Sequence, residues 1–207
     1  MATTSPERFA ALTDAAIALI AELGMRGLTH RAVDARAGLP AGTASAYLRT
    51  RKALVEAVVQ RIADLDTADL AAREVPTGAV DAAPDLDALA ASIAALLDDW
   101  LTTGRTRTLA RYACLLEATH HPELRPILAY GVAMRAQAQA LLTAAGAPDA
   151  EQRGSHLVAA VDGLLFDRLA GAGSLAAPPP GTPQNRADLT AAVRGLLRAA
   201  VVQSDYA

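Results

Sequence analysis

The chain has 207 residues, enough for one large domain or two small ones with a substantial core. Its 52% apolar content excludes a disordered protein, and its single cysteine, Cys114, excludes an internal disulfide framework. A net charge of −3 argues against an indiscriminate nucleic-acid binder, although the distribution of charge matters more than its total.

The first predicted helix runs from about Pro6 to Leu23. Ser5 is a suitable N-cap, Pro6 fits the first helical position, and apolar residues recur at helical spacing. This stretch is not a signal peptide, because Asp14 interrupts it and no cleavage pattern follows. No apolar run approaches the roughly 20 residues that span a bilayer. We therefore expect a cytoplasmic protein without a membrane partner.

Two short helices are predicted next. Thr29 caps a helix over residues 30–37, Gly38 supplies a left-handed turn, and a third helix runs from Pro40 to Leu48. Two short helices behind a longer supporting helix have the layout of a helix-turn-helix. The stretch Ala-Gly-Thr-Ala-Ser at 41–45 makes the third helix thin enough to enter a major groove. The alternative is a tightly packed bend between two core helices.

Positive charge is concentrated at the front of the chain. Residues 1–62 carry eight Lys/Arg and five Asp/Glu, whereas residues 63–207 carry eleven and seventeen. Tyr47 offers a phenolic hydroxyl, and Arg51 stands where a fourth helix begins, so its side chain and the backbone N–H groups can hold a phosphate together. This distribution favours DNA binding over a plain bend.

The rest of the chain also has helical patterns. Thr50 is the predicted cap of the fourth helix, which extends from Arg51 to about Glu74. Asp149 is the predicted cap of the eighth helix, and Gln152 completes a capping box there. Asn185 is the predicted cap of the last helix. Further helices are predicted over residues 86–104, 105–120 and 122–145, and the proline-rich stretch around 171–183 is predicted to be a linker. The predicted fold is all-α, with about nine helices.

Residues 8–60 resemble the DNA-binding domain of the TetR family of bacterial transcriptional repressors. Order and spacing agree over about 50 residues, and the matching residues are Gly27-Leu28-Thr29, Ala37-Gly38-Leu39, Gly42-Thr43, Tyr47 and Arg51-Lys52-Ala53-Leu54. Three positions depart from the family pattern. Pro40 replaces a capping serine, Ser45 a frequent tyrosine, and Leu48 a frequent phenylalanine.

The resemblance implies roles for individual residues. Thr29 would contact a phosphate, Arg31 would reach a base edge, and Arg51 would replace the usual phosphate-binding lysine. The full set of DNA-contacting residues that we predict is Thr29, His30, Arg31, Ala41, Gly42, Thr43, Ser45, Tyr47, Arg51 and Lys52. Since few of these side chains make bidentate base contacts, the shape of the DNA would carry much of the specificity.

The resemblance also implies a division of labour. Residues 1–50 would bind DNA, and residues 51–207 would bind a small-molecule ligand and form a homodimer through the last two helices, where Gly154, Gly163 and Gly195 permit close approach. The alternative is that these two helices only bury the protein's own core. Large or adaptable side chains available to line a ligand cavity are Trp100, Tyr112, Leu116, Met134 and Phe166, although each is also an ordinary core residue.

Cys114, Glu117 and His121 share one stripe of the sixth helix, and all three residue types bind zinc. The same residues also suit a buried cysteine and a polar helix end, so the sequence leaves both interpretations open and we predict no metal and no cofactor. No phosphate-binding loop, nucleophile elbow or metalloprotease signature is present, so we predict no enzymatic activity.

The sequence thus predicts a DNA-binding transcriptional regulator, in particular a repressor that a small molecule releases from its operator. The alternative is a ligand-binding or protein-interaction module that retains the helix-turn-helix fold without significant DNA affinity.

Overall fold

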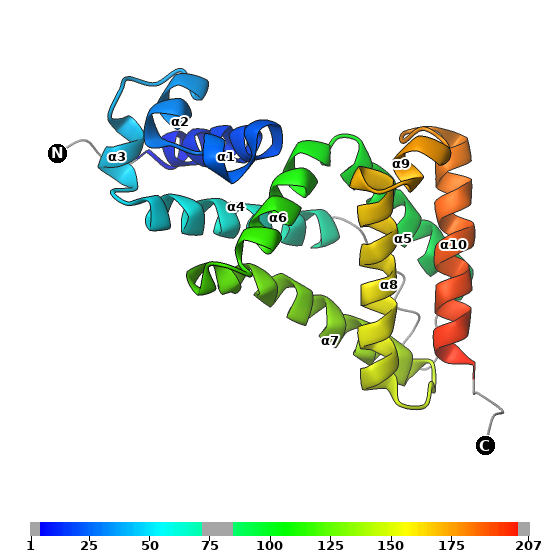
Figure 1. The fold of residues 1–207 in the computed structure, drawn as a ribbon. Coiled ribbons are helices and arrows are strands. Elements are labelled where there is room, and N and C mark those ends of the chain that lie inside the picture. The colour runs from blue at the N-terminus through cyan, green and yellow to red at the C-terminus, as the bar shows by residue number, and fades with distance from the viewer. Residues whose placement is uncertain (1–4, 72–84, 203–207) are drawn as a thin grey trace. The chain divides into compact units, whose positions relative to one another are not determined.

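The computed structural model describes residues 5–71 and 85–202, and every regular element in these ranges is helical. They form ten α-helices and one 3₁₀ helix: α1 (Pro6–Gly27), α2 (His30–Arg36), α3 (Thr43–Tyr47), α4 (Arg51–Ala71), α5 (Leu86–Leu101), α6 (Arg105–Glu117), η1 (Pro122–Ile127), α7 (Leu128–Ala144), α8 (Ala150–Ala170), α9 (Gly173–Ala176) and α10 (Pro183–Val201) (Figure 1). The predicted all-α fold is confirmed. None of the described helices combines the length and the hydropathy that crossing a bilayer requires.

The chain forms two compact units. The first comprises Met1–Ala68 and Thr106–Ala129, and the second comprises Asp69–Arg105 and Tyr130–Ala207. The first unit therefore contains the predicted helix-turn-helix together with most of α6 and η1, which come much later in the sequence.

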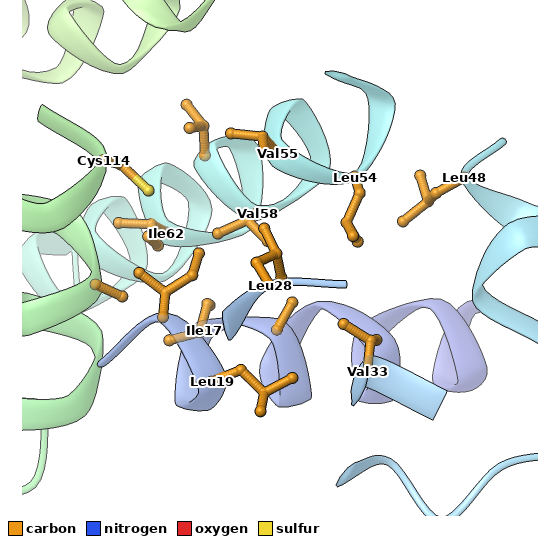
Figure 2. Close-up of a cluster of buried hydrophobic side chains, with 14 of the residues drawn as sticks. Ile17, Leu19, Leu28, Val33, Leu48, Leu54, Val55, Val58, Ile62 and Cys114 are labelled. Atoms are coloured by element: carbon orange, nitrogen blue, oxygen red, sulfur yellow. The ribbon is translucent and has the colours of Figure 1, made fainter. Parts of the chain in front are cut away.

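The core of the first unit lies between α1, α4 and α6 (Figure 2). Ile17 and Leu19 of α1, Val58 and Ile62 of α4 and Cys114 of α6 are all buried in one apolar cluster. Leu28, Val33, Ala44 and Leu48 extend this cluster under α2 and α3. Burial of a large aliphatic side chain contributes about 1.5–3 kcal/mol, so this core holds the two short helices, which are too short to be stable alone.

Ion pairs tie the helices of this unit together. Arg36 of α2 pairs with Glu22 of α1, and its hydrogen bond lowers the pKa of that carboxyl below the ordinary value. Arg61 of α4 binds Asp14 of α1, with 2.8 Å between Nε and Oδ1. These pairs are largely exposed and contribute orientation more than stability.

Asp66 of α4 is a buried ionic centre in the same unit. Its two carboxylate oxygens lie 2.8 Å from Arg107 Nε and 3.0 Å from Arg111 Nη1, both on α6. Because all three side chains are largely buried, the ion pairs fix α6 against α4 more firmly than surface pairs do.

In the second unit, α5 packs most extensively against α10, and α8 packs against both. Asp98 of α5 is completely buried and accepts three hydrogen bonds of 2.7 Å, from Gly181 N, Asn185 Nδ2 and Arg186 Nε. Burial alone raises the pKa of Asp98, but the bonds from Gly181, Arg186 and Asn185 outweigh it, and the pKa lies below its usual value. This carboxylate fixes the start of α10 on α5.

Local capping signals predicted several helix starts correctly. Pro6 opens α1, the Thr29 hydroxyl accepts from Ala32 N at 3.2 Å, and the Thr50 hydroxyl accepts from Ala53 N at 3.0 Å. Gly38 has the predicted left-handed conformation, with φ of 65°. Ser5 occupies the N-cap position, but its side chain makes no capping hydrogen bond.

Other boundaries differ from the prediction. The third helix begins at Thr43 rather than Pro40, because residues 40–42 form a turn in which Thr43 Oγ1 donates to the Pro40 carbonyl. The predicted linker contains the short helix α9. The first turns of the predicted seventh helix are the 3₁₀ helix η1, and the end of the predicted fourth helix lies outside the described residues.

Two predicted caps make no capping hydrogen bond, and one of them is wrongly placed. Asp149 occupies the N-cap position of α8 as predicted, but its φ is 49°, outside the usual extended region, and its side chain makes no capping bond. The cap of α10 is Thr182, whose hydroxyl accepts from Asn185 N at 3.2 Å. Asn185 lies one turn further on, buried, and it binds Asp98 instead.

Candidate nucleic-acid interface

The helix-turn-helix is held by a carboxylate that lies beneath the turn. Asp34 of α2 is buried and accepts hydrogen bonds from Gly42 N at 2.7 Å and Ala44 N at 2.6 Å. These are backbone donors at the start of α3, which would otherwise be unsatisfied. Asp34 therefore supplies the cap that Pro40 cannot, and it fixes α3 relative to α2.

The outer face of α3 is exposed and narrow. Ala44 and Leu48 are buried in the core, whereas Ala41, Gly42, Ser45 and Ala46 are exposed. Gly42 has φ of 90°, a left-handed conformation that favours glycine. An exposed helical face without long side chains lets a backbone approach base edges closely.

Two predicted contact residues at the start of α2 have accessible side chains. Arg31 is exposed and has no hydrogen bond or ion pair with any residue that the structure describes. Thr29 is also exposed, and its hydroxyl already accepts from Ala32 N. A threonine hydroxyl keeps its own proton to donate, which is what a phosphate oxygen needs.

His30 and Tyr47 have structural contacts instead. The Nε2 atom of His30 hydrogen-bonds the Leu48 carbonyl, which links α2 to the end of α3. The Tyr47 hydroxyl oxygen is covered and has no hydrogen-bond partner within the described ranges, and its ring packs on the core. A contact from Tyr47 to phosphate therefore requires its side chain to rotate, and it stays a prediction.

The cations at the start of α4 are bound in the protein. Arg51 donates from Nη1 to the Leu28 carbonyl at 2.5 Å and from Nη2 to the Met25 carbonyl at 2.7 Å. Lys52 is exposed and lies 3.7 Å from Glu56, one turn further along α4. The predicted role of these two residues at phosphate is untested by this geometry.

The five predicted ligand-lining residues divide between the units. Tyr112 is buried and Leu116 is 65% exposed, and both belong to the first unit. In the second unit, Trp100 is buried and Phe166 is 42% exposed, while Met134 is half-buried. The Nε1 atom of Trp100 lies 3.3 Å from Asp69 Oδ2.

An open cleft of about 550 Å³ lies at the start of α8, in the second unit. Polar side chains dominate its lining, which comprises Gln139, Asp149, Ala150, Glu151, Gln152 and Ser155. None of the predicted ligand residues lines this cleft, so it does not test the ligand prediction.

Cys114, Glu117 and His121 do not converge. Cys114 is fully buried with its Sγ 4.0 Å from Met25 Sδ, and burial, together with the charge of Glu117, raises its pKa to about 12. Glu117 and His121 form a partly exposed pair, 3.3 Å apart. Among the described residues, no three His, Cys, Asp or Glu side chains are grouped as metal ligands.

Fold and site together define an all-α protein with an exposed helix-turn-helix. Residues 84–199, more than half of the chain, match the family described as "Tetracyclin repressor-like, C-terminal domain". The chain therefore belongs to the TetR family of transcriptional regulators. Regulators of this family are non-enzymatic transcription factors, as the sequence predicts.

Solved structures of similar proteins cover nearly the whole chain. A transcriptional regulator from Rhodococcus sp. Rha1 is 27% identical, with 97% of this chain and 100% of that chain covered and a TM-score of 0.71. A TetR-family member from Streptomyces coelicolor A3 is 28% identical, with 90% and 98% covered and a TM-score of 0.67. The multidrug binding protein EbrR, complexed with imidazole, is 27% identical, with 98% and 100% covered and a TM-score of 0.65. No curated protein sequence matches the chain.

Proposed function

We propose that this protein is a homodimeric transcriptional repressor of the cytoplasm, which binds an operator through α3 and leaves it when a small molecule binds. The observation that carries the proposal is the outer face of α3. Small residues cover it, a buried carboxylate fixes its start, and Arg31, a cation without a partner among the described residues, lies nearby on α2. Duplex DNA is the partner that such a thin, rigid and cation-flanked helix fits.

Roles follow for the residues at this surface. Thr29 donates to a phosphate, Arg31 reads a base edge, and Ala41, Gly42, Thr43 and Ser45 lie in the major groove. In this division, residues 1–50 bind DNA and residues 51–207 bind the ligand and the second copy, with the helix that starts at Arg51 linking the two.

Binding to DNA is tested with the duplex directly upstream of the protein's own coding region. We expect its affinity to fall about a thousandfold between 50 and 200 mM salt, because several phosphate contacts release counterions. A random duplex of equal length should bind more weakly. Weak, salt-insensitive binding to both duplexes would support the alternative, a module without significant DNA affinity.

Pairing of two copies through α8 and α10 is supported by two glycines at which packing within the protomer leaves room for a side chain. A Cβ on Gly154 would lie 2.8 Å from Gln139 N, so this glycine serves packing within the chain. A Cβ on Gly163 or Gly195 would meet nothing within 4 Å. Glycine within a helix costs about 1 kcal/mol relative to alanine, so close approach by a second molecule accounts for both.

Sedimentation equilibrium tests this interface. Gly195→Leu should dissociate the dimer because its side chain would fill the space that the second copy occupies, while the helix content of the folded protomer, measured by circular dichroism, stays that of wild type. Gly131→Leu on α7 is the matched control, since Gly131 lies outside the proposed interface. A Gly195→Leu variant that dimerises like wild type would refute the interface.

The proposed effector is an aromatic organic cation. EbrR, 26–28% identical to this chain, has been crystallised with ethidium, proflavin and malachite green. In this chain, Trp100 lies beside the carboxylate of Asp69, a pairing of an aromatic ring and a negative charge that suits such ligands. Effector and operator would each weaken the other's binding by the same factor.

Thermal shift without DNA tests the effector class, because ethidium and proflavin bind DNA themselves. Ligand at a hundred times its Kd should stabilise the protein by about 2.7 kcal/mol. Trp100→Leu should reduce this stabilisation, and Leu175→Ala, which changes an exposed residue of the same unit outside the predicted ligand set, serves as its control. Absence of any shift with all three compounds would refute the proposed class.

A further inference from the structure

Arg51 has the contacts of a positioning residue. It begins α4, and its two terminal nitrogens donate to two carbonyls at the end of α1, those of Met25 and Leu28. Carbonyls at a helix end lack intrahelical partners, and a nearby arginine is a common way to satisfy them. The guanidinium therefore joins α4 to α1, and turning it toward DNA would break both hydrogen bonds.

Arg49 lies two residues earlier, between the end of α3 and the start of α4. Its neighbours are both fixed: the Leu48 carbonyl is bound by His30, and Thr50 caps α4. Arg49 itself is exposed and makes no hydrogen bond or ion pair with the described part of the chain. Its backbone is thus held in place at the end of α3 while its charge is left available.

The other cations near the helix-turn-helix also divide into those that contact another described residue of the protein and those that do not. Arg36 and Arg61 are paired with acids of α1, and Lys52 lies near Glu56. Arg8, Arg26, Arg31 and Arg49 have no partner within the described residues. Of these four, Arg31 lies in the first turn of α2 and Arg49 follows the end of α3, so both belong to the segment where the proposed DNA contact takes place.

We propose that Arg49 is the arginine that neutralises a DNA phosphate at the end of α3, and that Arg51 acts by positioning α4 on α1. This inference rests on the proposed function, because it needs a bound duplex. A free, exposed guanidinium can meet a phosphate oxygen without giving up an existing contact. Arg51 would have to give up two.

The test measures the salt dependence of binding to the upstream duplex, together with the melting temperature without DNA. Arg49→Ala should bind about tenfold more weakly and should lower the slope of log affinity against log salt by about 0.9 for each phosphate that the variant no longer neutralises. Its melting temperature should equal that of wild type. Arg49→Lys should restore the slope, because an ammonium also neutralises a phosphate.

Arg51→Ala should lower the melting temperature by about 3–6 °C, because the variant cannot form the two hydrogen bonds to α1. Arg51→Lys separates position from charge: a lysine cannot reproduce the two-pronged contact, so the melting temperature should fall while the salt slope stays that of wild type. Arg125→Ala, which removes an exposed arginine from η1, controls for the removal of one charge.

The measurements distinguish a failure of the proposed function from a failure of the inference about Arg49. Wild-type protein that binds neither duplex overturns the proposed function and this inference with it. Wild-type protein that binds, together with an Arg49→Ala variant of unchanged slope, overturns the inference alone. An Arg51→Ala variant whose slope of log affinity against log salt is lower, while its melting temperature is unchanged, would also overturn the inference, because Arg51 would then be the residue that contacts the phosphate.

Discussion

Asp34 fixes the start of α3, so replacing it should lower the free energy of unfolding by an amount that its hydrogen bonds determine. The carboxylate accepts from Gly42 N and Ala44 N at 2.7 and 2.6 Å, and it is 3% exposed. A hydrogen bond to a charged group contributes about 1.5–3 kcal/mol, and loss of a helix cap costs about 1 kcal/mol. Because these two figures describe overlapping contacts, we expect Asp34→Ala to cost about 3 kcal/mol.

For a chain of 207 residues, this change should lower the melting temperature by about 6–12 °C. Thermal unfolding followed by circular dichroism measures the shift. Asp34→Asn should fall between wild type and Asp34→Ala, because its amide has one acceptor oxygen for two N–H donors. Both variants should bind the upstream duplex more weakly than wild type at temperatures where they remain folded.

Asp14→Ala is the matched control, since it removes an aspartate from the same unit whose partner, Arg61, lies at the surface. Exposed ion pairs contribute about 0.2–1 kcal/mol, so its melting temperature should fall by no more than a few degrees. If Asp34→Ala and Asp14→Ala were equally stable, the buried carboxylate would not be what fixes α3, and the reasoning would be wrong.

Three further predictions concern the core. The pKa of Asp98 lies below its usual value, so the ionised carboxylate stabilises the fold fully above about pH 4, and this stabilisation is lost as the pH falls through the lowered pKa. In urea titrations, the difference in the free energy of unfolding between wild type and Asp98→Asn should therefore shrink at low pH. A difference that stays constant with pH would contradict this. Cys114, with a pKa of about 12, should react with a thiol reagent at pH 8 only after unfolding, and rapid labelling of the native protein would show that it is accessible. Gly154→Ala should destabilise the protein by about 1–3 kcal/mol, because its Cβ meets the backbone of Gln139, and a melting temperature equal to wild type would exclude that contact.

Features encoded by neighbouring residues could be predicted from the sequence. Thr29 and Thr50 cap their helices as predicted, since a threonine hydroxyl reaches a backbone N–H three residues ahead whatever surrounds it. Gly38 takes the predicted left-handed conformation, which is also a local preference, because a residue without a Cβ adopts it without strain. The helix-turn-helix is thus predictable from short-range chemistry and from the resemblance to a family.

Features that depend on distant partners could not be predicted. Asn185 has the composition of a cap but binds Asp98, a residue far away in the sequence, and no local pattern indicates that contact. The carboxylate of Asp34 replaces the missing cap of α3 from the preceding helix; an aspartate before a helix that lacks a capping side chain is a signal that could have suggested it. The motif predicts that Arg51 contacts a phosphate, which stays a prediction, but it does not indicate the two carbonyls near the end of α1 to which the guanidinium donates.

The most direct test of the central claim, that the outer face of α3 lies against DNA, is to place a negative charge on it. Ser45→Glu changes an exposed residue, so the melting temperature should stay that of wild type, while fluorescence anisotropy with the labelled upstream duplex should show affinity reduced by at least about a hundredfold. Ala68→Glu, on the exposed side of α4, should bind like wild type. A folded Ser45→Glu variant that binds the duplex as tightly as wild type would contradict the account.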